Sequence, residues 1–110
     1  METDKQSSLA EAMQQLWTRF LPQLEERVTA LEDAAAALAS GTLASELRKE
    51  ACSAAHKLAG VLGTFGLAEG TQLAREAETI YGGNSNPDTA EAARLAEIAA
   101  QLKAMLAGRR

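Results

Sequence analysis

Apolar residues recur at intervals of three and four along most of the chain, which is the spacing of one face of an α-helix. In the stretch 22–39 the intervals are four, three, four and three, and the residues that mark them are Leu24, Val28, Leu31, Ala35 and Leu38. Similar stripes predict further helices over about 8–21, from about 43 to 63 or 65, over about 67–81, and from 87 or 88 to the end of the chain.

Helix-breaking residues separate these stretches. Gly41 and Gly66 are stop signals, and the segment 82–87 (GGNSNP) is a loop by composition. Thr42 is a candidate N-cap for the middle helix. Pro22 either begins a second helix or kinks one long helix, and the pattern leaves both open.

The lengths of these helices predict the architecture. In the first stretch one face carries Leu9, Met13, Leu16 and Phe20, which we expect to point inward. Trp17 is expected to pack at the end of the bundle. Helices of this length joined by short turns favour an antiparallel bundle. We therefore predict an all-α fold, an antiparallel four-helix bundle with a short additional N-terminal helix, spanning residues 8–107 with frayed ends at 1–7 and 108–110.

Composition agrees with a single helical domain. The chain has 110 residues, of which 46% are hydrophobic, enough for one core. Alanine, leucine and glutamate dominate, and β-branched apolar residues are scarce, which favours helix over sheet.

Charge and cysteine content exclude several functions. A net charge of −4 gives no strong attraction for nucleic acid. No apolar run approaches the roughly 20 residues that cross a bilayer, and the polar N-terminus does not resemble a signal peptide. A single cysteine fits a reducing compartment, so we expect a cytoplasmic protein. One histidine and one cysteine do not make a usual zinc site, so neither a metal nor another cofactor is expected.

The only histidine, His56, falls opposite the apolar face of its helix. With Leu47 at 0° and 100° per residue, one arc about 100° wide holds Leu43, Ala51, Ala54, Leu58, Leu62 and Phe65. His56 lies at about 180° on the same wheel. The neighbours on its side are small or basic, and they are Lys49, Cys52, Ser53, Ala59, Gly60 and Gly63. Each glycine inside a helix costs about 1 kcal/mol relative to alanine. Two of them beside a histidine indicate either a helix crossing that needs small residues or another molecule that approaches the imidazole closely. Their position opposite the apolar stripe favours the second interpretation.

An exposed imidazole in this setting suits phosphoryl chemistry. It is largely neutral near pH 7 and is then a nucleophile toward phosphorus. A protruding ring can enter the acidic, Mg²⁺-containing pocket of another protein, which a buried ring cannot. Lys57 and Lys49 are close enough along the chain to balance phosphate charge.

The segment 55–67, AHKLAGVLGTFGL, resembles the signature of histidine-containing phosphotransfer (HPt) domains. That signature has a histidine, an apolar residue two positions on, and glycines four and ten positions on, matched by His56, Leu58, Gly60 and Gly66. The flanking segments 20–41 and 73–81 also resemble the helices that usually surround it. The resemblance implies that His56 is phosphorylated and that Gly60 gives a partner access to it.

The resemblance also implies the partners. They would be the aspartate-bearing receiver domains of response regulators, a hybrid histidine kinase, or both, in a two-component phosphorelay. We expect no nucleic-acid or membrane partner and a monomeric protein. No ATP-binding motif is present, so the chain is expected to carry phosphoryl groups without being an autokinase.

One position departs from the signature. Ala59 stands three residues after the histidine, where the family usually has a lysine that assists the phosphoryl group. Lys57, Lys49 and Arg75 are candidate substitutes. Glu78 follows the histidine by 22 residues, at a position where the family often has a polar residue.

Two other functions remain open. The missing lysine fits a receiver-binding or scaffolding bundle without phosphotransfer. A bundle used for dimerisation, with an incidental histidine, would leave a large apolar face uncovered. Cys52 is interpreted as a small neighbour of His56, since a Cys–His pair on one helix lacks an oxyanion hole.

Overall fold

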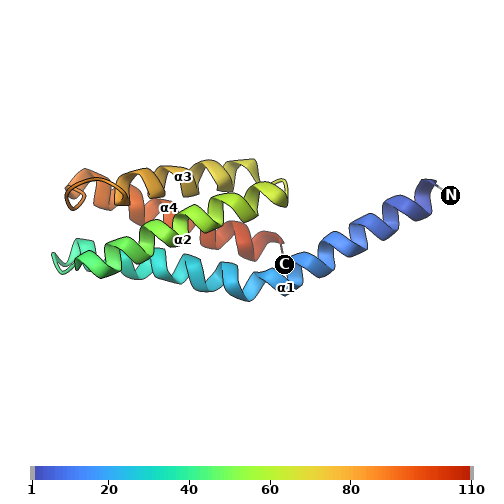
Figure 1. The fold of residues 1–110 in the computed structure, drawn as a ribbon, viewed down its shortest axis with the longest axis horizontal. Coiled ribbons are helices and arrows are strands. Elements are labelled where there is room, and N and C mark those ends of the chain that lie inside the picture. Colours follow the sequence, from blue (N-terminus) through green and yellow to red (C-terminus); the bar gives the residue numbers. More distant parts are fainter. Residues whose placement is uncertain (1, 110) are drawn as a thin grey trace.

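The computed structural model describes the backbone of residues 2–109 and the side chains of residues 8–109, and within that range it contains helices and no strand. The four helices are α1 (Glu2–Ala39), α2 (Ser45–Thr64), α3 (Ala68–Tyr81) and α4 (Thr89–Arg109). They run alternately up and down and are joined by short connections (Figure 1). The prediction of an all-α fold is confirmed.

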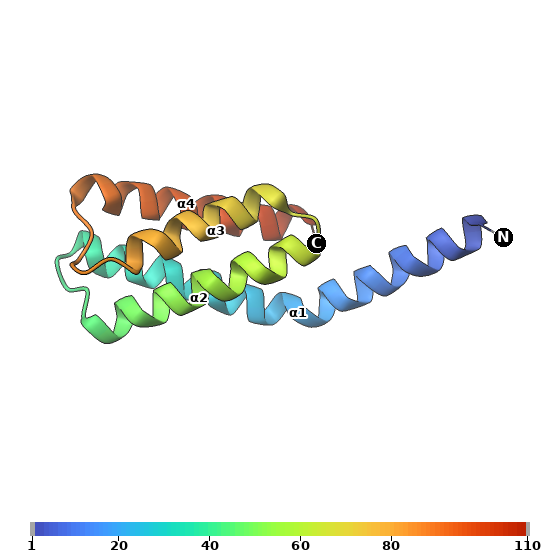
Figure 2. The ribbon, with the colours of Figure 1, turned by 45° about the horizontal axis from the view of Figure 1, so that its top comes forward.

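The helices form a closed ring of neighbours. Close backbone contacts join α1 to α2, α2 to α3, α3 to α4 and α4 back to α1, whereas no Cα atoms of the two diagonal pairs come within 8 Å of each other among the described residues. α2 packs against both α1 and α3, and in the view of Figure 2 it crosses in front of α1. A residue on the outer side of α2 is therefore flanked by α1 on one side and by α3 on the other.

The predicted apolar stripes from residue 24 onward form the core. The fully buried large side chains, each less than 2% exposed, are Trp17, Leu24, Leu31, Leu58, Leu62, Leu95, Ile98 and Leu102. Every helix contributes to the same cluster, in which many alanines lie between the larger residues. Small side chains at the helix contacts allow close approach of the backbones.

Two glycines end helices as predicted. Gly41 (φ +71°) and Gly66 (φ +75°) have the left-handed conformation that favours glycine. After α2, the amide of Gly66 donates to the Gly63 carbonyl and the amide of Leu67 donates to the Leu62 carbonyl. These two bonds form a Schellman motif, which reverses the chain toward α3.

The expected cap of the middle helix was wrong. Thr42 donates its hydroxyl to the Ala37 carbonyl at 3.2 Å, so it completes the end of α1. α2 starts only at Ser45, and Ala44 precedes it without a side-chain cap. The stronger cap lies at α4, where Asp88 Oδ1 accepts from the Glu91 amide and Glu91 Oε1 accepts from the Asp88 amide.

The short additional N-terminal helix is not observed as a separate element. α1 continues through Pro22 as one helix of 38 residues. Pro22 and Thr18 are both exposed, so the Thr18 carbonyl that loses its amide partner faces solvent and is free to bond water. Figure 1 shows α1 bending where it reaches the bundle, and a proline in the helix is the physical reason for such a bend.

The N-terminal part of α1 extends beyond the bundle (Figure 1), and the inward stripe expected there was wrong for two of its four residues. Leu9 is 67% exposed and Leu16 is 40% exposed. Met13 and Phe20 are only half-buried. Met13 and Phe20 nevertheless pack against the core together with the buried Trp17, so the inward face here is marked by residues 13, 17 and 20, and Leu16 faces outward.

Trp17 closes that end of the core, as predicted. Its ring lies edge-on to Phe65, with centroids 5.2 Å apart, and the Arg109 guanidinium lies 4.7 Å from its centroid. The described helices reach nearly to both ends of the chain, since α1 begins at Glu2 and α4 ends at Arg109. Frayed ends were expected at 1–7 and 108–110, and the outermost residues of these segments, 1 and 110, lie outside the described residues. No helix in the described range is long and apolar enough to span a membrane.

Candidate functional site: an exposed histidine on α2

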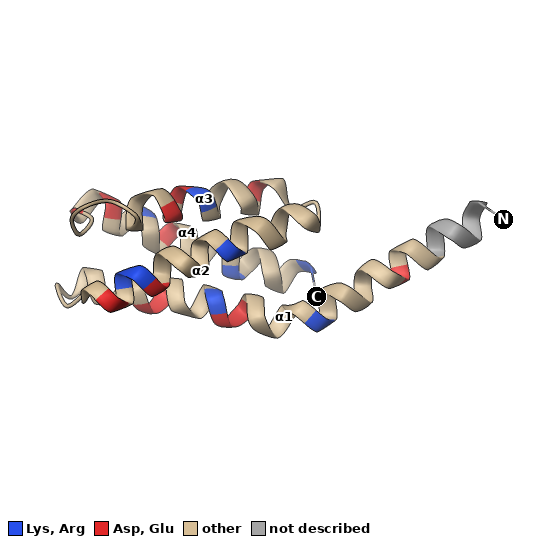
Figure 3. Ribbon diagram, in the orientation of Figure 1, with Lys and Arg blue, Asp and Glu red and all other residues tan. Residues whose placement is uncertain are grey.

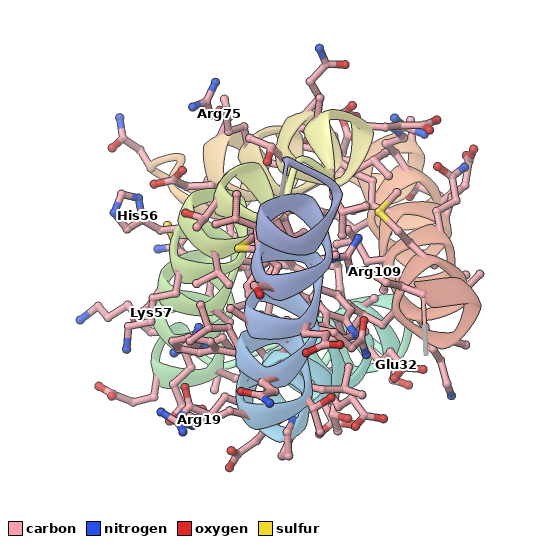
Figure 4. All side chains as sticks on the ribbon, turned by 90° about the vertical axis from the view of Figure 1, so that its right-hand side faces the viewer. Arg19, Glu32, His56, Lys57, Arg75 and Arg109 are labelled. Carbon is pink, nitrogen blue, oxygen red and sulfur yellow. The ribbon has the colours of Figure 1, made fainter. Side chains whose placement is uncertain are left out.

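His56 projects from the outer side of α2. Its side chain is 74% exposed, and Figure 4 shows the ring pointing away from the bundle. The opposite side of the helix is buried through Ala51, Ala54, Ala55, Leu58, Ala59 and Leu62. The same periodicity that buries these residues therefore exposes the imidazole, as its angle on the helix predicts.

One ring nitrogen is held by a carboxylate from the neighbouring helix. His56 Nδ1 lies 2.7 Å from Oε2 of Glu78 on α3. An ionised carboxylate only accepts hydrogen bonds, so Nδ1 carries the proton in this contact. The neutral ring then has its lone pair on Nε2, on the side that faces solvent. This tautomer is the one needed for nucleophilic attack from Nε2.

A hollow beside His56 opens toward α3, and we call it the α3-side hollow. Besides His56 and Glu78 it is lined by Arg48, Lys49, Cys52, Ser53, Tyr81, Gly82 and Gly83. Cys52 Sγ donates to the Glu78 carbonyl at 3.6 Å, so this thiol packs at the end of α3. That contact agrees with the interpretation of Cys52 as a small neighbour. Ser53 and Lys49 are exposed within the hollow.

A second hollow lies on the other side of His56, toward α1, and we call it the α1-side hollow. It is lined by Arg27, His56, Lys57, Gly60, Val61 and Thr64. Arg27 reaches it from α1, and the other residues belong to α2. Lys57 and Gly60 were predicted from the sequence as residues near His56, whereas Arg27 was not.

The chain matches a known protein family over most of its length. The model of the Hpt domain matches residues 15–109, which includes His56 and nearly all of the described bundle. This chain is a member of the Hpt domain family. Hpt domains serve phosphotransfer in two-component phosphorelays, where they interact with response-regulator receivers and kinases.

A curated relative supports the assignment. The Hpt domain is 33% identical over 81 residues to Protein RcaC from Microchaete diplosiphon, an alignment that covers 74% of this chain and 12% of RcaC. The chain therefore spans only a small part of the length of that relative. No solved structure matches the Hpt domain described here.

The two glycines near His56 differ in their surroundings. Gly60 is exposed, and a Cβ added there would meet nothing within 4 Å. Gly63 is also exposed, but a Cβ there would lie 3.3 Å from Thr71 Oγ1 of α3. Gly63 thus permits the close approach of α3 to α2, whereas nothing within the described bundle requires a glycine at position 60.

Ala59 does not belong to the exposed face, and its expected place on the docking surface was wrong. It is 6% exposed. Its carbonyl accepts a buried hydrogen bond from the Thr71 hydroxyl at 3.1 Å. α3 packs against this side of α2. In the Hpt domain a narrower part of the circumference of α2 around His56 is therefore exposed than the helical wheel predicts.

The three predicted cations, Lys57, Lys49 and Arg75, do not all lie beside His56. Lys57 projects on the same side of the bundle as His56, whereas Arg75 projects from α3 in a different direction (Figure 4). Arg75 lines neither hollow. Lys49 lines the α3-side hollow and Lys57 the α1-side hollow, so the structure brings two of the three candidate substitutes near the imidazole.

The surroundings of His56 are basic although the whole Hpt domain is acidic. Four basic residues line the two hollows, and they are Arg27, Arg48, Lys49 and Lys57. Glu78 is the one carboxylate in these linings. None of the four forms an ion pair with any described side chain. Figure 3 shows that elsewhere acidic and basic segments alternate along the helices, so no basic face extends over the bundle.

The described residues contain no cluster of three or more His, Cys, Asp or Glu side chains arranged to hold a metal ion. The cytoplasmic location inferred from the single cysteine stays a prediction.

Proposed function

We propose that His56 accepts a phosphoryl group on Nε2 and exchanges it with the aspartate of a response-regulator receiver domain. The observation that carries this proposal is the exposed imidazole whose Nδ1 is held 2.7 Å from Glu78, within a chain that belongs to the Hpt domain family. The contact fixes the ring orientation and leaves Nε2 as the nucleophile.

The phosphoryl transfer needs no cofactor bound to this chain. The Nε2 lone pair attacks the phosphorus of the receiver aspartyl phosphate, the N–P bond forms, and the P–O bond to the aspartate breaks. The carboxylate leaves with the electron pair of that bond. The ring becomes an Nδ1-protonated phosphoimidazolium, and Glu78 stabilises its positive charge. The reverse reaction returns the phosphoryl group to an aspartate by the same path.

Receiver docking requires the surface around the ring to be low and basic. Gly60, Ser53 and the half-buried Cys52 are small, so they leave the exposed imidazole accessible between the two hollows. Lys57, Lys49 and the exposed Gly63 complete the docking surface that we propose. The basic residues favour approach of the acidic phosphorylation site of a receiver. We propose that the domain acts as a monomeric phosphoryl carrier and not as an autokinase.

A labelling experiment tests this function. The domain and its His56→Gln variant are incubated with a receiver carrying a ³²P-labelled aspartyl phosphate, or with a hybrid kinase and labelled ATP. The wild-type domain is expected to take up a label that is acid-labile and base-stable, and the variant is expected to take up none. Equal labelling of the two proteins would disprove the assignment.

A receiver-binding module without phosphotransfer is the second candidate function, because Ala59 replaces the usual lysine. It predicts saturable binding of a receiver, measured by calorimetry, with no label on His56. The dimerisation alternative is favoured only by the exposed Leu9 and Leu16. It predicts concentration-dependent sedimentation, whereas a monomer at high concentration contradicts it.

A further inference from the structure

His56 is approached from two sides by oppositely charged residues. Glu78 comes from α3 and contacts Nδ1, while Arg27 comes from α1 and lines the hollow on the other side of the ring. α1 and α3 both pack against α2, and no Cα atoms of their described residues come within 8 Å of each other. The imidazole therefore contacts a carboxylate from one neighbouring helix, and an arginine of the other neighbouring helix lines the hollow beside it.

The ring geometry assigns the phosphoryl group to the side of Arg27. Nδ1 and Nε2 flank Cε1 of the imidazole and their outward bonding directions diverge widely, so a ring that turns Nδ1 toward α3 turns the Nε2 lone pair away from it. The α1-side hollow lies in that direction. Gly60 lines this hollow and has no side chain, and even a Cβ there would meet nothing within 4 Å. The space that a phosphoryl group on Nε2 needs is therefore open.

Arg27 has the properties of a phosphate ligand. It forms no ion pair with any described carboxylate, so its donors are available. It is only partly exposed, which means that its stem is packed and its range of positions is limited. A guanidinium presents a planar set of donors that matches two phosphate oxygens at once.

The other cations are less well placed for this role. Arg48 and Lys49 line the α3-side hollow, where Glu78 is also present, and Arg75 lines neither hollow. Lys57 lines the same hollow as Arg27, but it is a flexible, exposed point charge on the helix that carries His56. Position 59 is buried against α3 and holds an alanine.

We propose that Arg27 is the positioning residue that binds the phosphoryl oxygens of phosphorylated His56. It would supply from α1 the positive charge that a lysine three residues after the histidine supplies in the usual signature. This inference rests on the proposed function. Arg27 keeps its proton throughout, and it favours transfer by stabilising the negative charge of the phosphoryl group as the N–P bond forms or breaks.

The test uses phosphoramidate, a small phosphoryl donor whose reaction does not depend on receiver docking. The proteins are the wild-type domain, Arg27→Ala, Arg27→Lys, His56→Gln and Arg75→Ala, the last being an arginine outside both hollows. The rate of His56 phosphorylation is followed by ³¹P NMR, and folding is checked by circular dichroism. We expect Arg27→Ala to lower the rate about tenfold, Arg27→Lys to restore most of it, and Arg75→Ala to leave it unchanged.

A second readout reports the local charge. Loss of a nearby cation disfavours the dianionic phosphoryl group, so the pH at which the ³¹P signal titrates should rise in Arg27→Ala and not in Arg75→Ala. If the wild type is phosphorylated and Arg27→Ala behaves like Arg75→Ala in both readouts, the role of Arg27 is wrong and the proposed function stands. If neither the wild type nor His56→Gln is phosphorylated by phosphoramidate or by a phosphorylated receiver, the proposed function itself fails.

Discussion

Replacing Gly60 with alanine should make the domain more stable and less active. Gly60 lies inside α2, is exposed, and has open space where a Cβ would be. Alanine is favoured over glycine in a helix interior by about 1 kcal/mol. Because the added methyl meets nothing, the whole of this gain should appear as stability. For a domain of this size it corresponds to a rise in the melting temperature of about 4 °C.

The same methyl group should hinder the receiver. It would stand one helical turn from His56, on the surface where we propose that the partner docks. Overpacking a close contact typically costs about 1–3 kcal/mol, so we expect the rate of transfer from a phosphorylated receiver to fall about fivefold or more. Thermal unfolding by circular dichroism and transfer kinetics would be measured on the same preparation.

Gly63→Ala is the control for the gain in stability. Its new Cβ would lie 3.3 Å from Thr71 Oγ1, whose hydroxyl is committed to the Ala59 carbonyl. The gain in helix propensity should therefore be largely cancelled by crowding at α3. A Gly60→Ala variant that transfers as fast as wild type would refute the docking role of Gly60, and one without a gain in stability would refute the open space at that position.

Three further predictions concern other parts of the structure. Glu78→Ala should slow transfer from a phosphorylated receiver about fivefold by releasing Nδ1, with Glu78→Gln less affected, and unchanged kinetics in both would exclude a role for the 2.7 Å contact. Leu58→Ala should lower the free energy of unfolding in urea by about 2–5 kcal/mol, because Leu58 is fully buried between the helices, and a loss below about 1 kcal/mol would contradict that packing. Burial raises the pKa of Tyr81 to about 12 from 10.0, so the stability contributed by its neutral phenol is present below pH 10 and lost as the pH rises toward 12. Tyr81→Phe should remove this loss in urea unfolding compared at pH 8 and pH 11, and an identical decline in both proteins would count against it.

Local periodicity predicted most of the bundle. The stripe Leu24, Val28 and Leu31 is buried as expected, and so are the stripes of the later helices, because a helix that packs on neighbours along its whole length buries one continuous face. The outward direction of His56 followed from the same rule. These features depend on the rotation of residues about a single helix, which the sequence specifies.

Features that depend on neighbouring helices were not predictable in this way. Leu9 and Leu16 have the correct spacing, but the core contacts neighbouring positions of the helix, Met13 and Trp17, and leaves both leucines exposed. Ala59 lies toward the outside on the wheel, yet α3 covers it. The helix continues through Pro22 because the affected carbonyl faces solvent, and this orientation is set by packing.

The cations near His56 could likewise be predicted from the sequence only when they lie on the same helix. Lys57 was found because it adjoins His56, whereas Arg27 precedes His56 by 29 residues and belongs to another helix. No periodic pattern states which residues of α1 face the outer edge of α2. The family signature has its usual cation at position 59, whereas the structure has basic residues in both hollows beside the ring, none of them in an ion pair with a described side chain.

The most direct test of the account is long-range ¹H–¹⁵N NMR of the His56 imidazole before and after phosphorylation by a receiver. His56 is the only histidine in the chain, so its ring signals need no assignment among several histidines. The account predicts a ring protonated on Nδ1 in the free domain and a phosphoryl group on Nε2 in the phosphorylated one. A phosphoryl group on Nδ1, or a phosphorylated domain with unchanged ring signals, would contradict it.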